Sequence, residues 1–140
     1  MNEDFVLIVD DDEDARLLIT EIARIAGYAS ATAHNFVESK ALLDRRPSAV
    51  LLDMIMPDQL CIRIAAYMSE VMPKTPIILM SASDDVTRER MAQNMKALGL
   101  RVVATIHKPF WVDGLLEALA DALPNEAATV GISDDNGAQA

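Results

Sequence analysis

Two groups of carboxylates stand where apolar segments of the sequence end. An acidic triplet, residues 10–12, follows the apolar residues 5–9, and Asp53 closes the apolar run 49–53. Carboxylates gathered in a small volume repel one another, and a cation among them relieves that repulsion. Carboxylate oxygens are the ligands that Mg2+ prefers, so the acids predict a magnesium site if their two segments are neighbours.

Two further polar side chains follow later apolar segments. Ser81 comes after residues 76–80, and Lys108 comes after residues 100–106. A hydroxyl and an ammonium beside a metal-binding carboxylate cluster make a site complementary to a phosphoryl group. In such a site Asp53 is the nucleophile that forms an acyl phosphate. The ion and Lys108 neutralise charge on the transferring oxygens, and Ser81 hydrogen-bonds one of these oxygens after transfer.

Alternating strand and helix patterns predict how these residues are brought together. Strands are expected at 5–9, 28–33, 49–53, 76–80 and 100–106, and helices at 12–26, 35–46, 60–72, 84–98 and 113–123. Strict alternation predicts an α/β fold, a parallel sheet with helices on both faces. The strand order 2-1-3-4-5 of the doubly wound, flavodoxin-like arrangement makes the first and third strands neighbours, so that Asp10, Asp11 and Asp53 meet.

Local signals predict where the helices begin and which faces they bury. Asp12 can cap the first helix, and Asn35 with Glu38 has the spacing of a capping box at the second. Helical spacing predicts buried stripes on four helices, formed by Ala15, Leu18, Ile22 and Ile25; by Ile64, Met68 and Val71; by Met91, Met95 and Leu98; and by Val112, Leu115, Leu116, Leu119 and Leu123.

Composition indicates one cytoplasmic domain with a short tail. The chain has 140 residues, of which 51% are apolar, and it contains neither a bilayer-length apolar stretch nor a secretory leader pattern. Its net charge of -10 disfavours direct binding to nucleic acid. A single cysteine, Cys61, fits a reducing compartment and is expected to be a small packed residue. We expect a domain over 1–124 and a flexible tail or linker over 125–140.

The motifs at the strand ends resemble the receiver domain of two-component response regulators. The resemblance covers roughly residues 5–123 and rests on Asp10-Asp11, Asp53 with Met56-Pro57, Ser81-Ala82 and Lys108-Pro109-Phe110. It implies that Asp53 accepts phosphate from a sensor histidine kinase or a histidine phosphotransfer protein. It also implies that Asp11 and Asp53 ligate Mg2+ directly with the backbone carbonyl of Ile55, while Asp10 acts through water.

The same resemblance implies a switch and not an enzyme with its own output. Phosphorylation would shift the face made by the fourth helix, fifth strand and fifth helix, which alters a partner surface or a homodimer contact. Phe110 and Trp111 border this region and are as consistent with a contact surface as with packing.

Three positions depart from the receiver pattern. Leu60-Cys61 replaces the usual Asp-Gly pair, so a positive φ angle is disfavoured at that point. Ile55 stands two residues after the phosphoacceptor, where an apolar side chain should hinder the attacking water and slow phosphate loss. Thr105 stands where many receivers carry an aromatic, which excludes an aromatic rotamer switch at this position.

A fainter resemblance concerns the region before Lys108. The long spacing from Ser81 to Lys108 and the stretch 99–110, GLRVVATIHKPF, are similar to receivers attached to EAL-type cyclic-di-GMP phosphodiesterase domains. Since no such domain lies in these 140 residues, the similarity bears only on a partner or on a domain beyond the tail.

Two other functions are compatible with the pattern. One is a degenerate receiver that serves as a docking or dimerisation module without being phosphorylated. The other is a Mg2+-dependent phosphohydrolase of similar topology. That enzyme would need a general acid or base two residues after the nucleophile, and Ile55 cannot serve.

Overall fold

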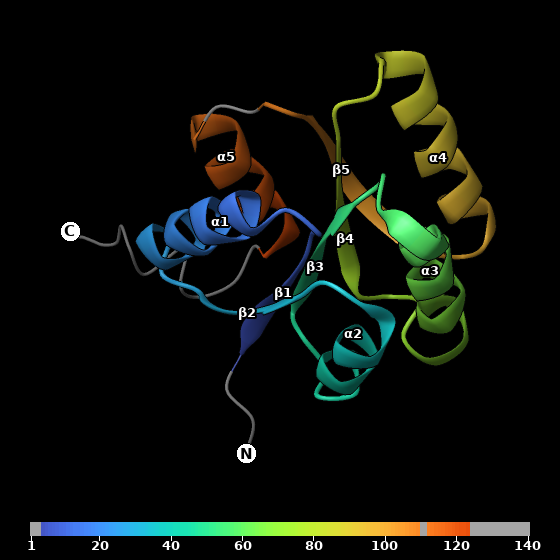
Figure 1. Cartoon of the computed structure of the whole chain (residues 1–140), viewed down its shortest axis with the longest axis horizontal. Helices are drawn as coiled ribbons and strands as arrows, with labels where there is room; N and C mark the ends of the chain where they lie inside the picture. Colours follow the sequence, from blue (N-terminus) through green and yellow to red (C-terminus); the bar gives the residue numbers. More distant parts are fainter. Residues whose placement is uncertain (1–3, 110–111, 124–140) are drawn as a thin grey trace.

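The computed structural model describes residues 4–109 and 112–123, in which strands and helices alternate along the chain (Figure 1). The strands are β1 Phe5–Val9, β2 Ala29–Ala33, β3 Ala49–Asp53, β4 Pro76–Ser81 and β5 Arg101–His107. The α-helices are α1 Glu13–Ile25, α2 Phe36–Leu43, α3 Leu60–Val71, α4 Asp85–Ala97 and α5 Val112–Ala122, and a 3-10 turn spans Pro57–Gln59. Each predicted element is present, although α2 ends earlier than expected.

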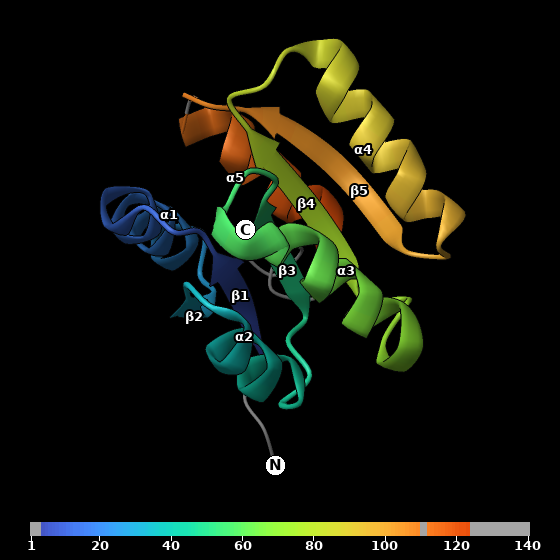
Figure 2. The same ribbon diagram turned by 45° about the vertical axis from the view of Figure 1, so that its right-hand side comes forward.

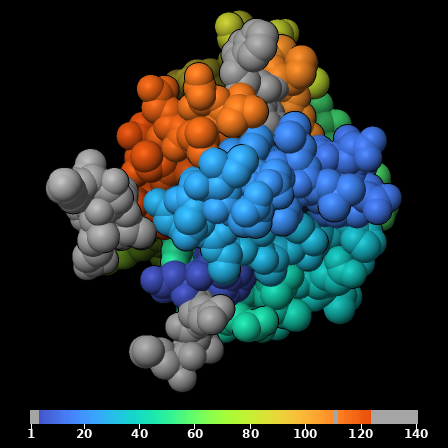
Figure 3. Space-filling model, turned by 90° about the vertical axis from the view of Figure 1, so that its left-hand side faces the viewer, coloured from blue at the N-terminus to red at the C-terminus, as the bar shows by residue number. Residues whose placement is uncertain are grey.

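The sheet is parallel throughout and has the order β2-β1-β3-β4-β5, which confirms the predicted fold. Helices α1 and α5 pack on one face, and α2, α3 and α4 pack on the other, so the protein has three layers (Figure 2). The space-filling view in Figure 3 looks onto the outer surface of α1, coloured blue, with α5 beside it in orange and red.

Strand composition explains the position of each strand in the sheet. The central strands β1, β3 and β4 are buried along their whole length and read as continuous apolar runs, as expected when helices cover both faces. The small and polar residues of β2 suit an edge. At the other edge, β5 shifts register against β4 between Ile77 and Ile78, and Val102 is the one buried residue along this strand.

Side-chain caps begin α1 and α2 as the sequence predicts. The Asp12 carboxylate accepts the N–H of Asp14 at the start of α1. Asn35 accepts the N–H of Glu38 at 2.8 Å, while the Glu38 carboxylate reaches back to the N–H of His34 at 3.1 Å. The bonds to Asp14 and Glu38 satisfy backbone donors that the first turn of a helix leaves unpaired, and the bond to His34 fixes the residue before the cap.

Several predicted core positions are wrong. On α1 the buried residues are Ile19, Ile22 and Ala23, whereas Leu18 and Ile25 are 48% and 60% exposed. The buried stripe is formed by Ile19 and by Ile22 and Ala23, which lie three and four residues later on the same face. Leu18 and Ile25 lie on the side of the helix, rotated by about 100° from the centre of this stripe. Three predicted core residues at or next to helix ends are also exposed; these are Val71, Leu98 and Val112.

The described structure ends just after α5. Leu123 follows this helix and is buried, and the predicted tail over 125–140 lies outside the described residues.

Among residues 4–109 and 112–123, no helix is long and apolar enough to cross a bilayer.

Candidate functional site

Three carboxylates meet at the carboxyl edge of β1 and β3. Val9 pairs with Leu52, so the residues after Val9 lie beside Asp53 at the end of β3. Asp10, Asp11 and Asp53 each offer an oxygen that lies within 4.8 Å of the other two. Asp10 and Asp53 are buried and Asp11 is exposed. This set of hard oxygen donors, open to solvent on the Asp11 side, fits a Mg2+ ion.

Lys108 brings a positive charge to the same carboxylates. Its Nζ lies 2.5 Å from Oδ2 of Asp10 and 3.4 Å from Oδ2 of Asp53. The backbone N–H of Lys108 donates to the Ser81 carbonyl at 2.8 Å, which fixes the end of β5 against the end of β4. One ammonium therefore faces two buried carboxylates from different strands.

Burial and neighbouring charges shift the pKa values of Asp53 and Lys108. Burial raises the pKa of Asp53 to about 6, the negative charge of Asp10 acts in the same direction, and Lys108 opposes both. For Lys108, burial lowers the pKa, but the hydrogen bond to Asp10 and the charges of both carboxylates outweigh it and raise the pKa above its ordinary value. At neutral pH an anionic Asp53 therefore faces a cationic Lys108.

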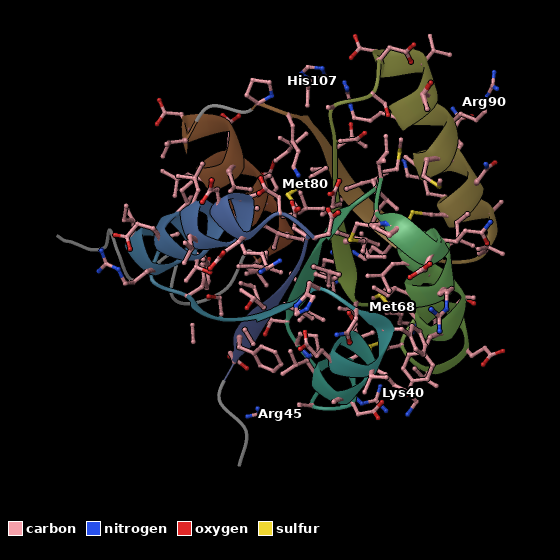
Figure 4. All side chains as sticks on the ribbon, in the orientation of Figure 1. Lys40, Arg45, Met68, Met80, Arg90 and His107 are labelled. Carbon is pink, nitrogen blue, oxygen red and sulfur yellow. The ribbon has the colours of Figure 1, made fainter. Side chains whose placement is uncertain are left out.

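Ser81 reaches the same edge but its hydroxyl is engaged elsewhere. Asp53 pairs with Met80 of β4, labelled in Figure 4, so Ser81 is the next residue along that strand. The buried Ser81 hydroxyl donates to Oγ of Ser83 at 2.8 Å and accepts the Ser83 N–H at 2.9 Å. Both bonds are made within the loop that follows β4.

The segment after Asp53 carries two of the three sequence departures, at Ile55 and at Leu60-Cys61. The Ile55 N–H donates to the Asp53 carboxylate at 3.3 Å, and the Ile55 side chain is 60% exposed beside it. The positive φ angles occur at Asp58 and Gln59, at 61° and 55°. The left-handed turn is thus completed before Leu60, which has a helical φ of -60°.

The structure also places Cys61, Thr105 and His107, which lie outside the acidic cluster. Cys61 is buried in the core, as predicted, and burial together with the charge of Asp53 raises its pKa to about 12. Thr105 and His107 are exposed on β5, and Figure 4 labels His107 at the end of that strand. Phe110 and Trp111 lie outside the described residues.

Sequence reasoning missed one basic residue near the acids. Arg16 of α1 donates from Nη1 to the Asp10 carbonyl at 2.7 Å and so holds the backbone that carries the acidic loop. A signal existed, because Arg16 stands one helical turn after the cap Asp12 and therefore near the start of the same loop.

A hollow of about 390 Å3 opens beside Lys108. Its lining includes Ala15 and Leu18 of α1 together with Ala82 and Pro109 from the loops after β4 and β5. The exposed Leu18 flank, unexpected from the sequence, therefore forms an apolar wall next to the charged site.

Comparison with sequence families and curated proteins gives consistent matches. The family model described as the response regulator receiver domain matches residues 6–120. The chain is 33% identical over 125 residues to sporulation initiation phosphotransferase F of Bacillus subtilis, which covers 89% of this chain and 96% of that protein. It is also 33% identical over 110 residues to the phosphate regulon transcriptional regulatory protein PhoB of Pseudomonas aeruginosa, covering 75% of this chain and 45% of that protein.

Solved structures have the same fold. Chemotaxis protein CheY4 of Vibrio cholerae is similar with a TM-score of 0.73 and 25% identity, over 87% of this chain and 100% of that chain. A response regulator receiver protein from Burkholderia phymatum is similar with a TM-score of 0.70 and 27% identity, over 87% and 96% of the two chains. The resemblance of residues 99–110 to receivers joined to EAL-type domains stays a prediction. The chain belongs to the response regulator receiver domain family.

Proposed function

We propose that this protein is a phosphoacceptor switch in a two-component system, with Asp53 as the residue that is phosphorylated. One observation carries the proposal: Lys108 Nζ faces both Asp10 and Asp53 from the end of a different strand. A buried carboxylate with an ammonium beside it suits nucleophilic attack on a phosphorus atom, because the ammonium neutralises charge that builds up on the phosphoryl oxygens.

In the proposed reaction an Asp53 oxygen attacks the phosphorus of a phosphohistidine. The new oxygen–phosphorus bond forms as the nitrogen–phosphorus bond breaks, and the electron pair of the broken bond stays on the imidazole nitrogen. Lys108 pairs with a phosphoryl oxygen, and Ser81 donates its hydroxyl proton to another once it has turned from Ser83. The product is an acyl phosphate on Asp53.

Mg2+ is the proposed cofactor. Asp11 and Asp53 would hold the ion with the carbonyl oxygen of Ile55, and Asp10 would act through a water molecule. When bound, the ion supplies positive charge that stabilises the phosphoryl oxygens during transfer. The exposure of Asp11 supports an ion that keeps several waters.

The proposed phosphoryl donor is a sensor histidine kinase or a histidine phosphotransfer protein. The hollow lined by Leu18, Ala82 and Pro109 supports docking of a protein donor, because apolar surface beside a charged site can seat a helix while the site receives the phosphoryl group. The name of the Bacillus subtilis relative, a phosphotransferase, also fits relayed transfer.

The proposed output is a changed surface on α4, β5 and α5, read by a partner or by a second copy of this chain. The exposed residues Val86 and Val112 at the starts of α4 and α5 support a role for this face in contacts. We further propose a cytoplasmic protein that acts without direct contact to nucleic acid or membrane, in keeping with its net charge of -10.

Phosphorylation by a small phosphodonor tests the proposal. The protein is incubated with acetyl phosphate and Mg2+, and the intact mass is measured for the wild type, Asp53→Asn and a control, Asp58→Asn, which removes an exposed carboxylate from the same loop. The wild type and the control should gain one phosphoryl group, and Asp53→Asn should gain none. A wild type that gains no mass would favour the docking-module alternative, and a gain that persists in Asp53→Asn would reject Asp53 as the acceptor.

A further inference from the structure

Arg88 is a buried arginine in the first turn of α4. The residue is 8% exposed, and its guanidinium points back to the loop that joins β4 to α4. Nη1 donates to the Ser83 carbonyl at 2.7 Å, and Nη2 donates to the carboxylate of Asp85. Among the described residues, Nε has no hydrogen-bond partner although it is buried. Arg88 thus ties the core-facing side of α4 to Ser83.

Ser83 in turn controls the hydroxyl of Ser81. A serine hydroxyl has one proton to donate, and the Ser81 proton is directed to Oγ of Ser83. The Ser83 N–H occupies an acceptor position on the same oxygen. For Ser81 to donate to a phosphoryl group on Asp53, its bond to the Ser83 hydroxyl must break, and a shift of the loop that carries Ser83 would break it.

We propose that Arg88 is a positioning residue that holds the 81–83 loop in a resting conformation, with the Ser81 hydroxyl withheld from the phosphoryl site. The inference rests on the proposed phosphorylation of Asp53. Moving the Ser83 carbonyl away from Arg88 leaves a second buried guanidinium donor without an acceptor, which penalises the activated loop. Phosphorylation has to overcome that penalty.

The same contact couples the loop to a helix. Because Arg88 belongs to α4, a loop that pulls the Ser83 carbonyl away also removes a tether from the first turn of this helix. Thr105 cannot act as the aromatic switch found in many receivers, so Arg88 gives this chain a separate link between Ser81 and α4.

Beryllofluoride, which binds aspartate carboxylates as a mimic of an acyl phosphate, tests the inference. The dissociation constant is measured by calorimetry with Mg2+ present for the wild type, Arg88→Met and Arg90→Met. Arg90 is an exposed arginine two residues along α4, labelled in Figure 4, and serves as the matched control. Arg88→Met should bind beryllofluoride about tenfold more tightly than the wild type, and Arg90→Met should match the wild type.

The affinity for Mg2+ alone distinguishes a specific effect of Arg88 on Ser81 from a general loss of structure. Affinity for Mg2+ alone should be unchanged in Arg88→Met, since Ser81 meets only the phosphoryl group, whereas a loosened structure would weaken both ligands. Ser83→Ala removes the Oγ acceptor at a half-buried loop residue and should tighten beryllofluoride binding about fivefold even if Arg88→Met folds poorly. Unchanged or weaker beryllofluoride binding in an Arg88→Met variant that keeps its Mg2+ affinity overturns the role of Arg88, as does unchanged or weaker binding in Ser83→Ala. A wild type that binds no beryllofluoride overturns the phosphoacceptor function itself.

Discussion

The ammonium of Lys108, at the end of β5, lies 2.5 Å from the carboxylate of Asp10, at the end of β1. Asp10 is completely buried, so its charge would be costly without this partner. Lys108 lies farther from Asp53, at 3.4 Å. Among the described residues, Lys108 is the cation that pairs with the carboxylates of Asp10 and Asp53. The negative charge that remains on the three carboxylates, including Asp11, favours a divalent ion.

Replacing Lys108 with methionine should separate metal binding from phosphorylation. Without the ammonium, the carboxylates attract Mg2+ more strongly, and we expect its dissociation constant to fall about tenfold. Phosphorylation by acetyl phosphate should slow by about a hundredfold, because the charge that stabilises the phosphoryl oxygens is gone. Mg2+ titration and the rate of mass gain measure the two effects.

Thermal unfolding provides the control for this variant. Lys108→Met leaves Asp10 buried without a cation, so we expect a loss of about 3 kcal/mol in the free energy of unfolding in chelator and a larger Mg2+-induced rise in Tm than in the wild type. Lys74→Met, at an exposed lysine, should change neither quantity. Equal Mg2+ affinity in Lys108→Met and the wild type would contradict the electrostatic account.

The raised pKa of Asp53 predicts how stability depends on pH in the absence of metal. The pKa is about 6 in the folded protein against an ordinary value of 3.8, so between these pH values the folded state binds more protons than the unfolded state. Stability from this group is therefore lost as pH rises through that window. Asp53→Asn removes the penalty and should raise the free energy of unfolding at pH 7.5 by about 1–2 kcal/mol, after allowance for solvent screening.

Denaturant unfolding in chelator at several pH values measures this difference. It should shrink towards zero as the pH falls below 3.8, where Asp53 becomes protonated in the unfolded state as well as in the folded state. Asp58→Asn, at an exposed acid in the loop between β3 and α3, should show no comparable pH-dependent gain. If Asp53→Asn is less stable than the wild type at pH 7.5, the Asp53 carboxylate is stabilised by its neighbours and the predicted sign is wrong.

The sheet could be predicted from the sequence because its strands are unambiguous. Continuous apolar runs such as 49–53 are typical of buried parallel strands, and a polar residue at the end of each run then falls on one edge of the sheet. Together with the strand order 2-1-3-4-5, this pattern predicts that Asp10, Asp11 and Asp53 come together, and the geometry agrees.

Which individual side chains are buried depends on tertiary packing and could not be predicted from the sequence pattern. A helical stripe fixes a period but not the angle at which the helix meets the sheet, so the pattern predicts a core position for Leu18 although it lines the hollow beside Lys108. Likewise, hydrophobicity patterns treat Arg88 as a surface residue. Its burial arises because the loop carbonyl of Ser83 and the carboxylate of Asp85 supply acceptors that only the folded loop brings together.

The domain boundary can be tested by truncation. Leu123 is buried after the end of α5, and its carbonyl lies 3.5 Å from the Tyr28 hydroxyl, which connects it to the segment after α1. A chain that ends at residue 124 should therefore keep the Tm and the phosphorylation rate of the full chain. Ending the chain at residue 118 removes Leu119 and Leu123 from the core and should lower the free energy of unfolding by several kcal/mol, about 2–5 for each. A clear loss of stability on removing only 125–140 would contradict the boundary.

The exposed side chain of Ile55 should protect the acyl phosphate from hydrolysis. Its N–H bonds the Asp53 carboxylate at 3.3 Å, so the side chain stands beside the path of an attacking water and offers that water no hydrogen bond. Ile55→Asn adds a polar group that can orient the water, and we expect phosphate loss to accelerate about threefold to tenfold. Ile25→Asn is the matched control, since Ile25 is equally exposed, at 60%, but lies at the far end of α1. The decay of the phosphorylated mass after removal of the donor gives both rates, and equal lifetimes for Ile55→Asn and the wild type would show that the side chain does not limit access of water to the phosphorus.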